Sequence, residues 1–318
     1  MLKKRLISLP LVALAYVILV GGAPLWLLLG FIVSRVSKWR SMTQMVAFAI
    51  SFINIEVIAL AWLSFNRLVF FDDARRMQAN YAAQAWWAST LLKVGGWIYQ
   101  LTFTVSGEEA IDGPSAILIA RHASIGDNVV PMVFFGTPRG TPLRYILKQE
   151  LTWLPTLGYG GNSLPNLFVD RSGTNTPEAV AGVRSLITTS GPHESVLIYP
   201  EGTRFTKAKQ AALAAKPDLA PQVERWPDLL PPRLGGVTTL LEANALENLG
   251  KDVVMLCHNG FEGAASALDL ANGRWVKQTI ALHFWRIPFA EIGEDFQAFV
   301  FEQWDEMQRQ LLRLREQA

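Results

Sequence analysis

Several residue types that mark large protein classes are scarce in this chain of 318 residues. It has one cysteine, Cys257, which excludes an internal disulfide and a cysteine-rich metal site and fits a reducing compartment. Charged residues make up only 18% of the chain, and the net charge is +2. No basic stripe of the kind that neutralises many phosphates is visible, so no nucleic-acid partner is expected.

Familiar functional signatures are also missing. The chain contains none of the glycine-rich phosphate-binding motifs of nucleotide-binding proteins and no Gly-x-Ser-x-Gly motif of serine hydrolases. It has only four histidines, and no His-Glu-x-x-His or similar cluster of metal ligands occurs among them. We therefore expect no metal and no bound cofactor.

What the chain has in abundance is apolar sequence. Half of its residues are hydrophobic, which is high for a water-soluble protein and indicates contact with a membrane. Residues 6–34 carry no charge and follow the basic stretch Lys3-Lys-Arg5, and this run is long enough to cross a bilayer. It is too long for a signal peptide and lacks a clear cleavage site, so we expect it to be retained. Pro24, within Gly21-Gly-Ala-Pro, predicts a kinked span or two short halves that enter and leave on one side.

A second apolar segment covers residues 42–66 and contains Asn54 and Glu56. An acid at membrane depth normally pairs with a neighbouring helix or lines a polar cavity, so we prefer a structural pairing of Glu56 to a catalytic role. The flanks of both segments are basic, which fits a re-entrant or interfacial pair; two full spans are the alternative. Either arrangement predicts a protein of the bacterial inner membrane, or an equivalent membrane, whose remaining residues face the cytoplasm.

Residues 72–99 include Trp86, Trp87 and Trp97 and predict an amphipathic helix at the membrane interface, with a core-facing helix as the alternative. The expected organisation is thus membrane-anchoring helices in 1–71, this interfacial helix in 72–99, and one domain in 100–318. Residues 207–233, which are rich in alanine and proline, look like a surface loop inserted into that domain.

From residue 100 onward, apolar strands alternate with helical segments. This alternation predicts an α/β domain with a mostly parallel central sheet flanked by helices. Ligands in that architecture lie beyond the carboxyl ends of the strands. The expected strands are Leu101–Val105, Ala116–Ala120, Leu143–Leu147, Asn166–Val169, Val196–Tyr199, Val253–His258 and Thr279–Ile287, and the expected helices are Asp127–Phe135, Thr176–Ser190, Gly236–Leu249 and Asp295–Arg315.

His122 and Asp127 follow the predicted strand 116–120. A neutral imidazole can accept a proton near pH 7, and a carboxylate on its other nitrogen fixes the tautomer. On a continuous helix, five positions turn two residues about 140° apart, so a turn must intervene, and Gly126 allows one. The alternative is a loop histidine followed by an aspartate that caps a helix.

Two further strand ends carry arginine, namely Asp170-Arg171 and Tyr199-Pro-Glu201-Gly-Thr-Arg204. The guanidinium fork matches phosphate oxygens, so the pair indicates an anionic headgroup; the alternative is that Asp170 and Glu201 simply neutralise the arginines. We interpret His258 as a strand-end core histidine. Two other functions remain as alternatives: a metal-dependent hydrolase using His122, Asp127 and His258, and a membrane adaptor without catalysis.

Three blocks of sequence occur in this order: His122-x4-Asp127, Phe168-Val-Asp-Arg171 and Tyr199-Pro-Glu-Gly-Thr-Arg204. In this order they resemble the glycerolipid acyltransferases typified by 1-acyl-sn-glycerol-3-phosphate acyltransferase. Further stretches are similar to the subgroup that contains lysophosphatidate and lysocardiolipin acyltransferases. Two positions depart from the family pattern: Arg121 stands where asparagine is usual and Pro165 where a glycine is usual, and Arg121 adds a cation beside the expected site. The further stretches are Lys148-Gln-Glu-Leu151 with Pro155 and Gly158, Glu201-Gly-Thr-Arg-Phe-Thr206, Leu230-Pro-Pro-Arg233 and Arg286-Ile-Pro288.

The resemblance implies a glycerol-3-phosphate acyltransferase-like fold and a membrane-bound enzyme. It implies acyl transfer from acyl-CoA or acyl-carrier protein, as co-substrate, to lysophosphatidic acid, giving phosphatidic acid. Lysocardiolipin and lysophosphatidylglycerol are alternative acceptors, and membrane lipids are expected partners. His122, oriented by Asp127, would be the general base. The glycerol phosphate would be positioned by Arg171, Glu201, Gly202, Thr203 and Arg204, with weaker contributions from Lys148 and Arg233.

Overall fold

The computed structural model describes residues 2–154, 156–170 and 176–317. It divides into two compact units. The helical unit comprises Met1–Leu101, Leu147–Arg171 and Ala267–Gln278, and the sheet unit comprises Thr102–Ile146, Ser172–Ser266 and Thr279–Ala318. The helical unit therefore includes two segments that the sequence does not set apart from the strands around them.

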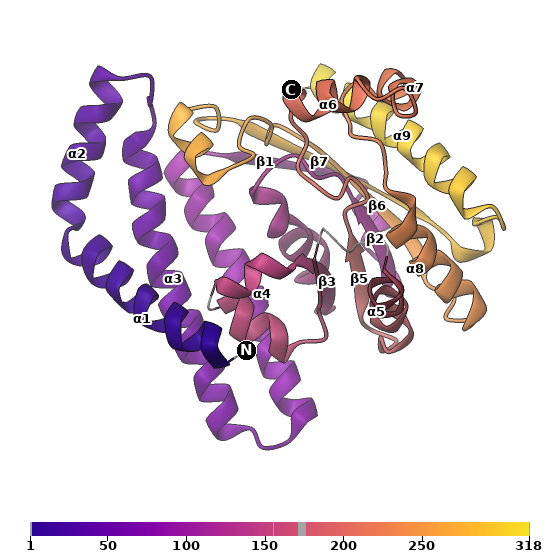
Figure 1. Ribbon diagram of the computed structural model, residues 1–318, viewed down its shortest axis with the longest axis horizontal. Coiled ribbons are helices and arrows are strands. Elements are labelled where there is room, and N and C mark those ends of the chain that lie inside the picture. Colours follow the sequence, from indigo (N-terminus) through magenta and orange to yellow (C-terminus); the bar gives the residue numbers. More distant parts are fainter. Residues whose placement is uncertain (1, 155, 171–175, 318) are drawn as a thin grey trace. The chain divides into compact units, whose positions relative to one another are not determined.

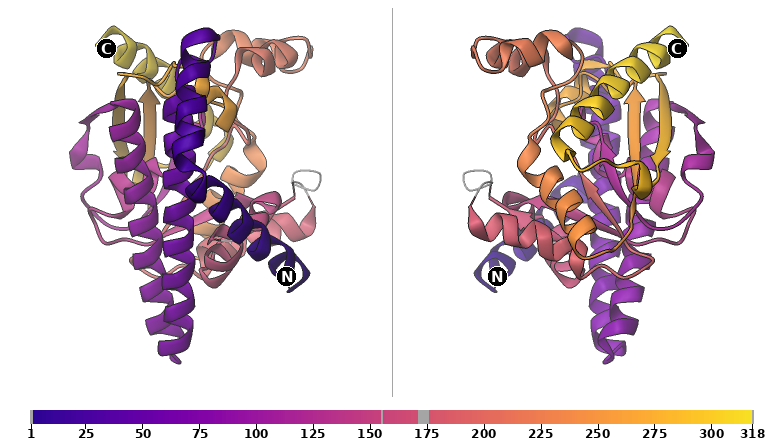
Figure 2. Two further views of the ribbon diagram at one scale, coloured as in Figure 1. Left: turned by 90° about the vertical axis from the view of Figure 1, so that its left-hand side faces the viewer. Right: turned by 90° about the vertical axis from the view of Figure 1, so that its right-hand side faces the viewer.

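Four helices form most of the helical unit: α1 (Leu2–Gly21), α2 (Ala23–Val36), α3 (Met42–Val69) and α4 (Asp73–Tyr99). The predicted break in the first apolar run is confirmed, because α1 and α2 are bent by 71° where they meet and proline opens the first turn of α2. By length and composition, α3 could cross a membrane, and the bent pair could do so if it counts as one span. Figure 2 shows α3 and α4 lying side by side along their length.

Polar side chains join α3 to α4 inside this helical pair. The indole Nε1 of Trp87 donates a 2.8 Å hydrogen bond to the carboxylate of Glu56, which is 2% exposed. The amides of Asn66 and Asn80 are joined by a bond of 3.0 Å. The structural pairing expected of an acid in an apolar helix is therefore present for Glu56.

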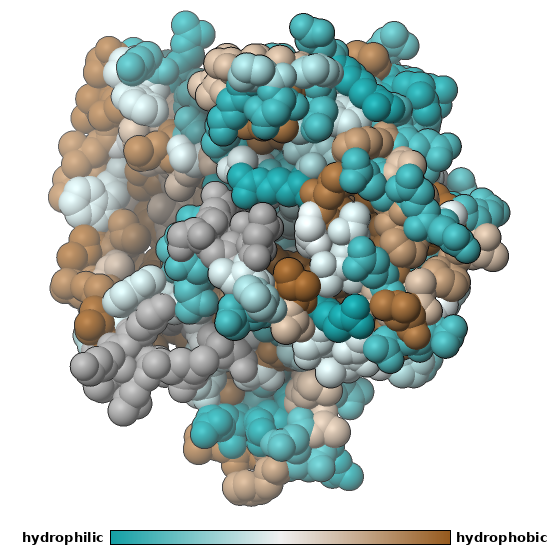
Figure 3. Space-filling view, turned by 45° about the vertical axis from the view of Figure 1, so that its right-hand side comes forward, coloured by the Kyte–Doolittle hydropathy of each residue, from teal (hydrophilic) through white to brown (hydrophobic). Residues whose placement is uncertain are grey.

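Large apolar side chains are exposed on the first two helices. Figure 3 shows hydrophobic residues gathered over these N-terminal helices. The exposed side chains on α1 and α2 include Leu11, Leu14, Val17, Leu25, Leu28, Phe31 and Val36. In a protein in water, a contiguous apolar surface of this kind normally marks contact with a partner or a membrane.

The sheet has seven strands in the order β1-β7-β6-β2-β5-β3-β4 (Figure 1). Strand β2 pairs in parallel with both β5 and β6, β3 pairs in parallel with β5, and β1 pairs in parallel with β7, whereas β6 and β7 are antiparallel. The expected mostly parallel sheet is thus confirmed, with each expected strand present. The strands are β1 (Thr102–Ser106), β2 (Ala116–Ala120), β3 (Leu143–Lys148), β4 (Leu167–Val169), β5 (Ser195–Ile198), β6 (Asp252–Asn259) and β7 (Thr279–Ile287).

The central strands are buried on both faces, as their continuous apolar runs predict. Every residue of β2 is buried, and so is every residue of β5. Helices α5 (Pro177–Thr188), α8 (Leu234–Leu246) and α9 (Phe296–Glu316) pack together along one side of the sheet (Figure 1). Cys257 of β6 is fully buried, which raises the pKa of its thiol to about 12. It is therefore the inert core thiol that its apolar surroundings predict.

Two segments differ from their expected local structure. The expected helix 127–135 is irregular, with a 3-10 turn η2 (Gly126–Asn128) followed by a π-helical turn η3 (Met132–Gly136); Pro131 between them has no N–H to donate. Segment 207–233, expected to be a loop, contains helices α6 (Lys207–Ala214) and α7 (Ala220–Arg225). Alanine favours helix, and Thr206 caps α6. The remaining short helical turns are η1 (Glu108–Ala110), η4 (Gln149–Trp153), η5 (Thr156–Gly160), η6 (Gly161–Ser163), η8 (Ala267–Asn272) and η9 (Phe289–Glu291).

Candidate active site

His122 and Asp127 form a hydrogen-bonded pair at the carboxyl end of β2. The Nδ1 atom of His122 lies 3.1 Å from Oδ2 of Asp127. The turn that this spacing requires is made by the 3-10 turn η2, which begins at Gly126 and carries Asp127. Among the described residues, the other ring nitrogen of His122 has no hydrogen-bond partner. A neutral ring with its proton on Nδ1 therefore presents Nε2 as a free proton acceptor.

Asp127 is almost completely buried but well supplied with donors. It accepts hydrogen bonds from the backbone N–H of Ala123 at 2.5 Å and of Ser124 at 2.7 Å, and from the Ser124 hydroxyl at 2.9 Å. Burial alone would raise the pKa of this carboxyl, but the neighbouring His258 and His122 outweigh burial and hold the pKa well below its usual range. Asp127 thus both organises the turn and orients His122 as a carboxylate.

The pKa of His122 is lowered from its ordinary value of 6.5. Burial of the ring is the largest cause, the hydrogen bond to Asp127 opposes it, and the charges of Arg204 and His258 lower the pKa further. The imidazole is therefore mostly neutral near pH 7. A neutral imidazole is the form that a general base needs.

The segment Tyr199–Phe205, which follows β5, holds His122 from both sides of its backbone. The N–H of His122 donates to Oε1 of Glu201 at 2.6 Å, and the N–H of Phe205 donates to the His122 carbonyl at 2.7 Å. The ring of Tyr199 stacks on the imidazole with 4.5 Å between centroids, and its hydroxyl donates to the Asp127 carbonyl at 2.5 Å. The first and third sequence blocks are thus one structural assembly, because β2 and β5 are adjacent parallel strands.

Glu201, expected from the sequence to help position a headgroup, has both of its oxygens bonded to the backbone. Besides the His122 N–H, it accepts a hydrogen bond from the N–H of Leu230 at 3.1 Å. The side chain is 2% exposed, and burial raises its pKa to about 7 although the charge of Arg121 acts against this. No ion pair joins Glu201 to Arg204 in the part of the chain that the structure describes. Its contacts are those of a residue that positions His122.

The guanidinium of Arg204 has an unused donor, and its charge acts on the base. Its Nη1 donates to the carbonyl of Ala265 at 2.6 Å, while its buried Nε has no partner among the described residues. Burial lowers the pKa of Arg204, and the charge of Asp127 acts against this. A half-buried guanidinium without a carboxylate partner can bind an anion.

The other residues expected to bind substrate fall in different places. Gly202 has a φ of 64°, and a Cβ there would lie 2.9 Å from Cδ of Arg233, so the two positions are in close contact. The hydroxyl of Thr203 accepts a 2.9 Å hydrogen bond from Lys209. Lys148 belongs to the helical unit, where its ammonium pairs with Glu150 at 2.9 Å. Arg171 and Pro155 lie outside the described residues.

Sequence reasoning gave other roles to two residues next to the pair, His258 and Arg121. Nε2 of His258 lies 3.2 Å from Oδ1 of Asp127, so the carboxylate is shared by two histidines, although this contact lacks hydrogen-bond geometry. Arg121, expected to add a free cation, is fully buried; it pairs with Glu262 and donates to the carbonyl of His258 at 2.6 Å. The signal for His258 is its position at the carboxyl end of β6, which is the other parallel neighbour of β2.

A metal site is not visible in this cluster. Within residues 2–154, 156–170 and 176–317, no group of three or more His, Cys, Asp or Glu side chains is arranged to hold a metal ion. The hydrogen bonds of Asp127 are also those of a carboxylate saturated by backbone and hydroxyl donors. The geometry favours acid–base chemistry by His122.

Comparisons with known proteins point to one family. Residues 102–247 match the sequence model of the acyltransferase domain. Over 110 residues, which are 34% of this chain, the protein is 30% identical to mouse (Mus musculus) 1-acyl-sn-glycerol-3-phosphate acyltransferase epsilon, and it spans about 30% of that protein's length. The crystal structure of the 1-acyl-sn-glycerophosphate acyltransferase of Thermotoga maritima has the same fold, with a TM-score of 0.58 and 15% identity over 85% of this chain and 95% of that one. Together, these comparisons support a glycerolipid acyltransferase family for this chain, whose matched domain covers residues 102–247.

Proposed function

We propose that this protein transfers a fatty acyl group from an acyl thioester to the free hydroxyl of lysophosphatidic acid, giving phosphatidic acid. The observation that carries the proposal is the His122–Asp127 pair, whose imidazole keeps Nε2 free and feels the positive charge of Arg204. Two relatives bear names that specify a 1-acyl-glycerophosphate as the acceptor. The base and the nearby cation are the groups that such an acceptor needs.

In the proposed mechanism, Nε2 of His122 removes the proton of the acceptor hydroxyl while that oxygen attacks the thioester carbonyl. Asp127 stabilises the imidazolium that forms, and its low pKa keeps it a carboxylate throughout. The new C–O bond forms, the C–S bond breaks, and the leaving thiolate takes the proton back from His122. The acyl group passes directly to the acceptor, so no acyl-enzyme is required.

The phosphate of the acceptor is assigned to arginine. Arg204 has an unpaired Nε and lies close enough to His122 to lower its pKa, so a phosphate bound there would bring the glycerol hydroxyl toward the base. Arg171 and Lys148 are proposed as further cationic contacts, as the family resemblance implies. Gly202, which follows Glu201, has a backbone conformation that glycine readily adopts and lies next to Arg233.

A membrane location follows from the substrates and from the N-terminal helices. Both substrates carry long acyl chains that partition into a bilayer. The apolar surface of α1 and α2 and the length of α3 would seat the protein in an inner membrane or its equivalent, with the sheet unit in the cytoplasm. Partition of the full chain into the membrane fraction, resistant to high salt, tests this part of the proposal.

The test of the catalytic proposal is His122→Ala in the full-length protein in detergent micelles. Transfer of labelled acyl groups from acyl-CoA to lysophosphatidic acid should fall by about 10²-fold to 10⁴-fold, the usual contribution of a general base. His283→Ala is the matched control, since that ring is half-buried on β7 and bonds Ser106 at 2.9 Å. Unchanged transfer in His122→Ala, with both variants folded, would disprove the assignment of the base. Assays with lysocardiolipin and lysophosphatidylglycerol in place of lysophosphatidic acid identify the acceptor. A wild-type protein that transfers no acyl group to any of them would favour the alternative function, a membrane adaptor without catalysis.

A further inference from the structure

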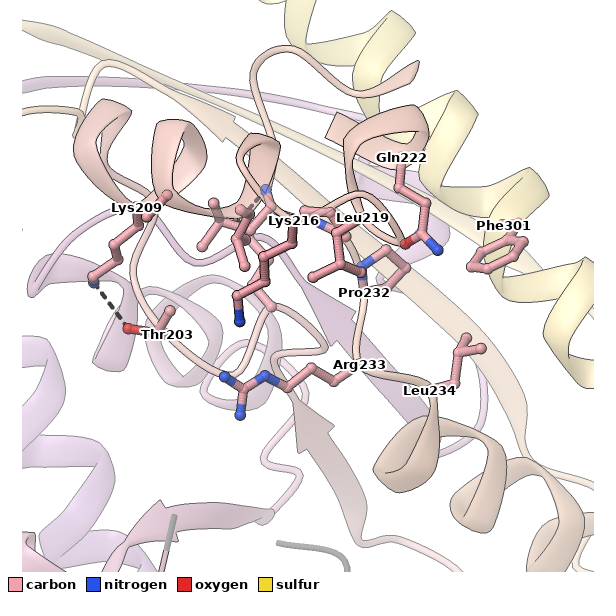
Figure 4. Close-up of a pocket in the computed structure, with 14 residues that line it drawn as sticks. Thr203, Lys209, Lys216, Leu219, Gln222, Pro232, Arg233, Leu234 and Phe301 are labelled. Atoms are coloured by element: carbon pink, nitrogen blue, oxygen red, sulfur yellow. Dashed lines mark hydrogen bonds between the residues drawn. The ribbon is translucent and has the colours of Figure 1, made fainter. Parts of the chain in front are cut away.

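A cavity of about 550 Å³ lies next to the His122 assembly, within the sheet unit (Figure 4). Its walls come from the segment that begins after β5, runs through α6 and α7 and enters α8, together with Phe301 of α9. Glu201 and Leu230, which are bonded to each other, both line it, and Glu201 also holds the backbone of His122. A single residue, Glu201, therefore connects the wall of the cavity to the backbone of the base.

Positive charge is concentrated on one side of this cavity. The side chains of Lys216 and Arg233 extend into the same space in Figure 4, close to Thr203. Lys209 adds a third cation, held by hydrogen bonds to the Thr203 hydroxyl at 2.9 Å and to the Arg204 carbonyl at 2.7 Å. The lining residues are all described, and together they place three cations around one volume.

The cavity contains almost no compensating negative charge. Glu201 is the single acid on its wall, and both of its oxygens accept backbone N–H groups. Among the described residues, no carboxylate pairs with Lys216 or Arg233, whereas Lys207 on the same segment lies 3.8 Å from Asp228. Cations that converge on a space without an acid are suited to a multiply charged anion.

The lining of the cavity also includes the apolar side chains of Leu213, Leu219, Leu234 and Phe301. A ligand that contacts both the cations and these apolar side chains has phosphate at one end and a largely uncharged arm. Such a ligand fits better than a small inorganic anion, which would leave the apolar side chains in contact with water.

The proposed reaction uses two substrates that carry phosphate, and the sheet unit has two separate sets of cations. The charge of Arg204 acts on His122 and Asp127, where the acceptor hydroxyl must lie. We propose that the cavity of Lys209, Lys216 and Arg233 binds the phosphate end of the acyl donor, a phosphopantetheine thioester. This inference rests on the proposed function, and it gives segment 207–233 the role of donor-binding element.

Lys216→Gln and Arg233→Gln test the inference, with Lys207→Gln as the matched control on a lysine whose side chain is 74% exposed and outside the cavity. The KM for palmitoyl-CoA should rise about tenfold in each test variant, as expected for losing one charge-assisted hydrogen bond. The KM for lysophosphatidic acid should change less than twofold. A rise in the acceptor KM with an unchanged donor KM would assign the cavity to the acceptor and overturn the inference.

Donor analogues sharpen this result. The penalty should persist with palmitoyl-phosphopantetheine and vanish with palmitoyl-N-acetylcysteamine, which has no phosphate. An equal penalty for both donors would overturn the inference. Between the two natural sources of phosphopantetheine, a larger penalty with palmitoyl-CoA than with palmitoyl carrier protein identifies coenzyme A, and the reverse identifies the carrier protein.

A binding measurement separates this inference from the proposed function. Calorimetry with free coenzyme A should show binding to the wild-type protein and to Lys207→Gln, with about tenfold weaker binding to Lys216→Gln. That pattern in a protein that transfers no acyl group would disprove the proposed reaction and retain the donor site. A different pattern would disprove the donor site alone. In that pattern, the wild-type protein transfers acyl groups, and Lys216→Gln and Arg233→Gln change neither the binding of coenzyme A nor the KM for the donor.

Discussion

The sheet unit holds buried charges at both edges of its parallel strands, and the two sets are bonded differently. At the amino edge, Arg144 donates to Glu194, to the Thr189 hydroxyl and to the carbonyls of Leu186 and Thr189. Next to it, the ammonium of Lys251 donates to the Ser115 hydroxyl and to the carbonyls of Gly191 and Glu194. Every donor nitrogen of these two cations has a partner.

At the carboxyl edge, several buried side-chain atoms lack partners. The Nε atoms of Arg121 and Arg204 make no hydrogen bond among the described residues, and neither ring nitrogen of His258 does. Leaving a buried donor unpaired costs about 1 to 3 kcal/mol. Arg144 and Lys251 are thus arranged for stability, whereas the half-buried Arg204 keeps a donor that a substrate can use.

The largest expected effect concerns Asp127→Asn. An amide cannot replace the carboxylate that orients His122, so kcat should fall by about 10³-fold or more. The amide nitrogen would also face backbone donors of Ala123 and Ser124, so some stability should be lost. Product formation and thermal unfolding, measured on the same sample, separate the two losses. A variant that keeps more than a tenth of wild-type kcat would contradict the role given to Asp127.

Arg144→Met tests the amino edge. Its loss leaves Glu194 buried without its main partner, so the free energy of unfolding should fall by about 3 kcal/mol. Activity per folded molecule should not change, because Arg144 lies at the opposite edge from His122. Denaturant unfolding measures the loss, and Arg309→Met is the control on an exposed pair, with an effect below about 1 kcal/mol. A fall in kcat of the folded protein would mean that the two edges are coupled.

His258→Gln tests the second histidine at Asp127. We expect kcat to fall about tenfold, since one of the two histidines that share the carboxylate is lost. The charge of His258 lowers the pKa of His122, so its removal should move the acid limb of the kcat/KM profile to higher pH. A purely structural role for His258 would change the amount of folded protein without moving this limb.

The smallest expected effect comes from Glu201→Gln. The pKa of Glu201 is raised to about 7, so its carboxyl protonates as the pH falls through that value and can no longer accept one of its two backbone N–H groups. Wild-type activity should therefore begin to fall near pH 7. In the Gln variant, only the lower pKa of His122 remains, so the midpoint of the pH dependence of activity should move below 6.5. The kcat at pH 8 should fall a few-fold. Identical midpoints in the two proteins would show that Glu201 does not titrate in this range.

Much of this architecture could be predicted from the sequence, because apolar runs bounded by turn residues locate strands. The expected strand at Ala116–Ala120 matches β2 residue for residue, and the turn between His122 and Asp127 is present. The contacts across strands could not be predicted. From the sequence, Glu201 is expected to help position the headgroup. Only the adjacency of β2 and β5 reveals that it holds the His122 backbone. Arg121 read as a free cation because its partner Glu262 is distant in the sequence.

The backbone of His122 is held through its own N–H by Glu201 and through its carbonyl by the N–H of Phe205. These two amide hydrogens can exchange with solvent deuterium only when the loop after β5 detaches from the end of β2. Their exchange rates therefore report how often the catalytic base is out of place, without any substrate being present. A ligand that steadies this loop should slow the exchange of both hydrogens together. Their exchange rates would then show directly whether a bound ligand holds the base in place.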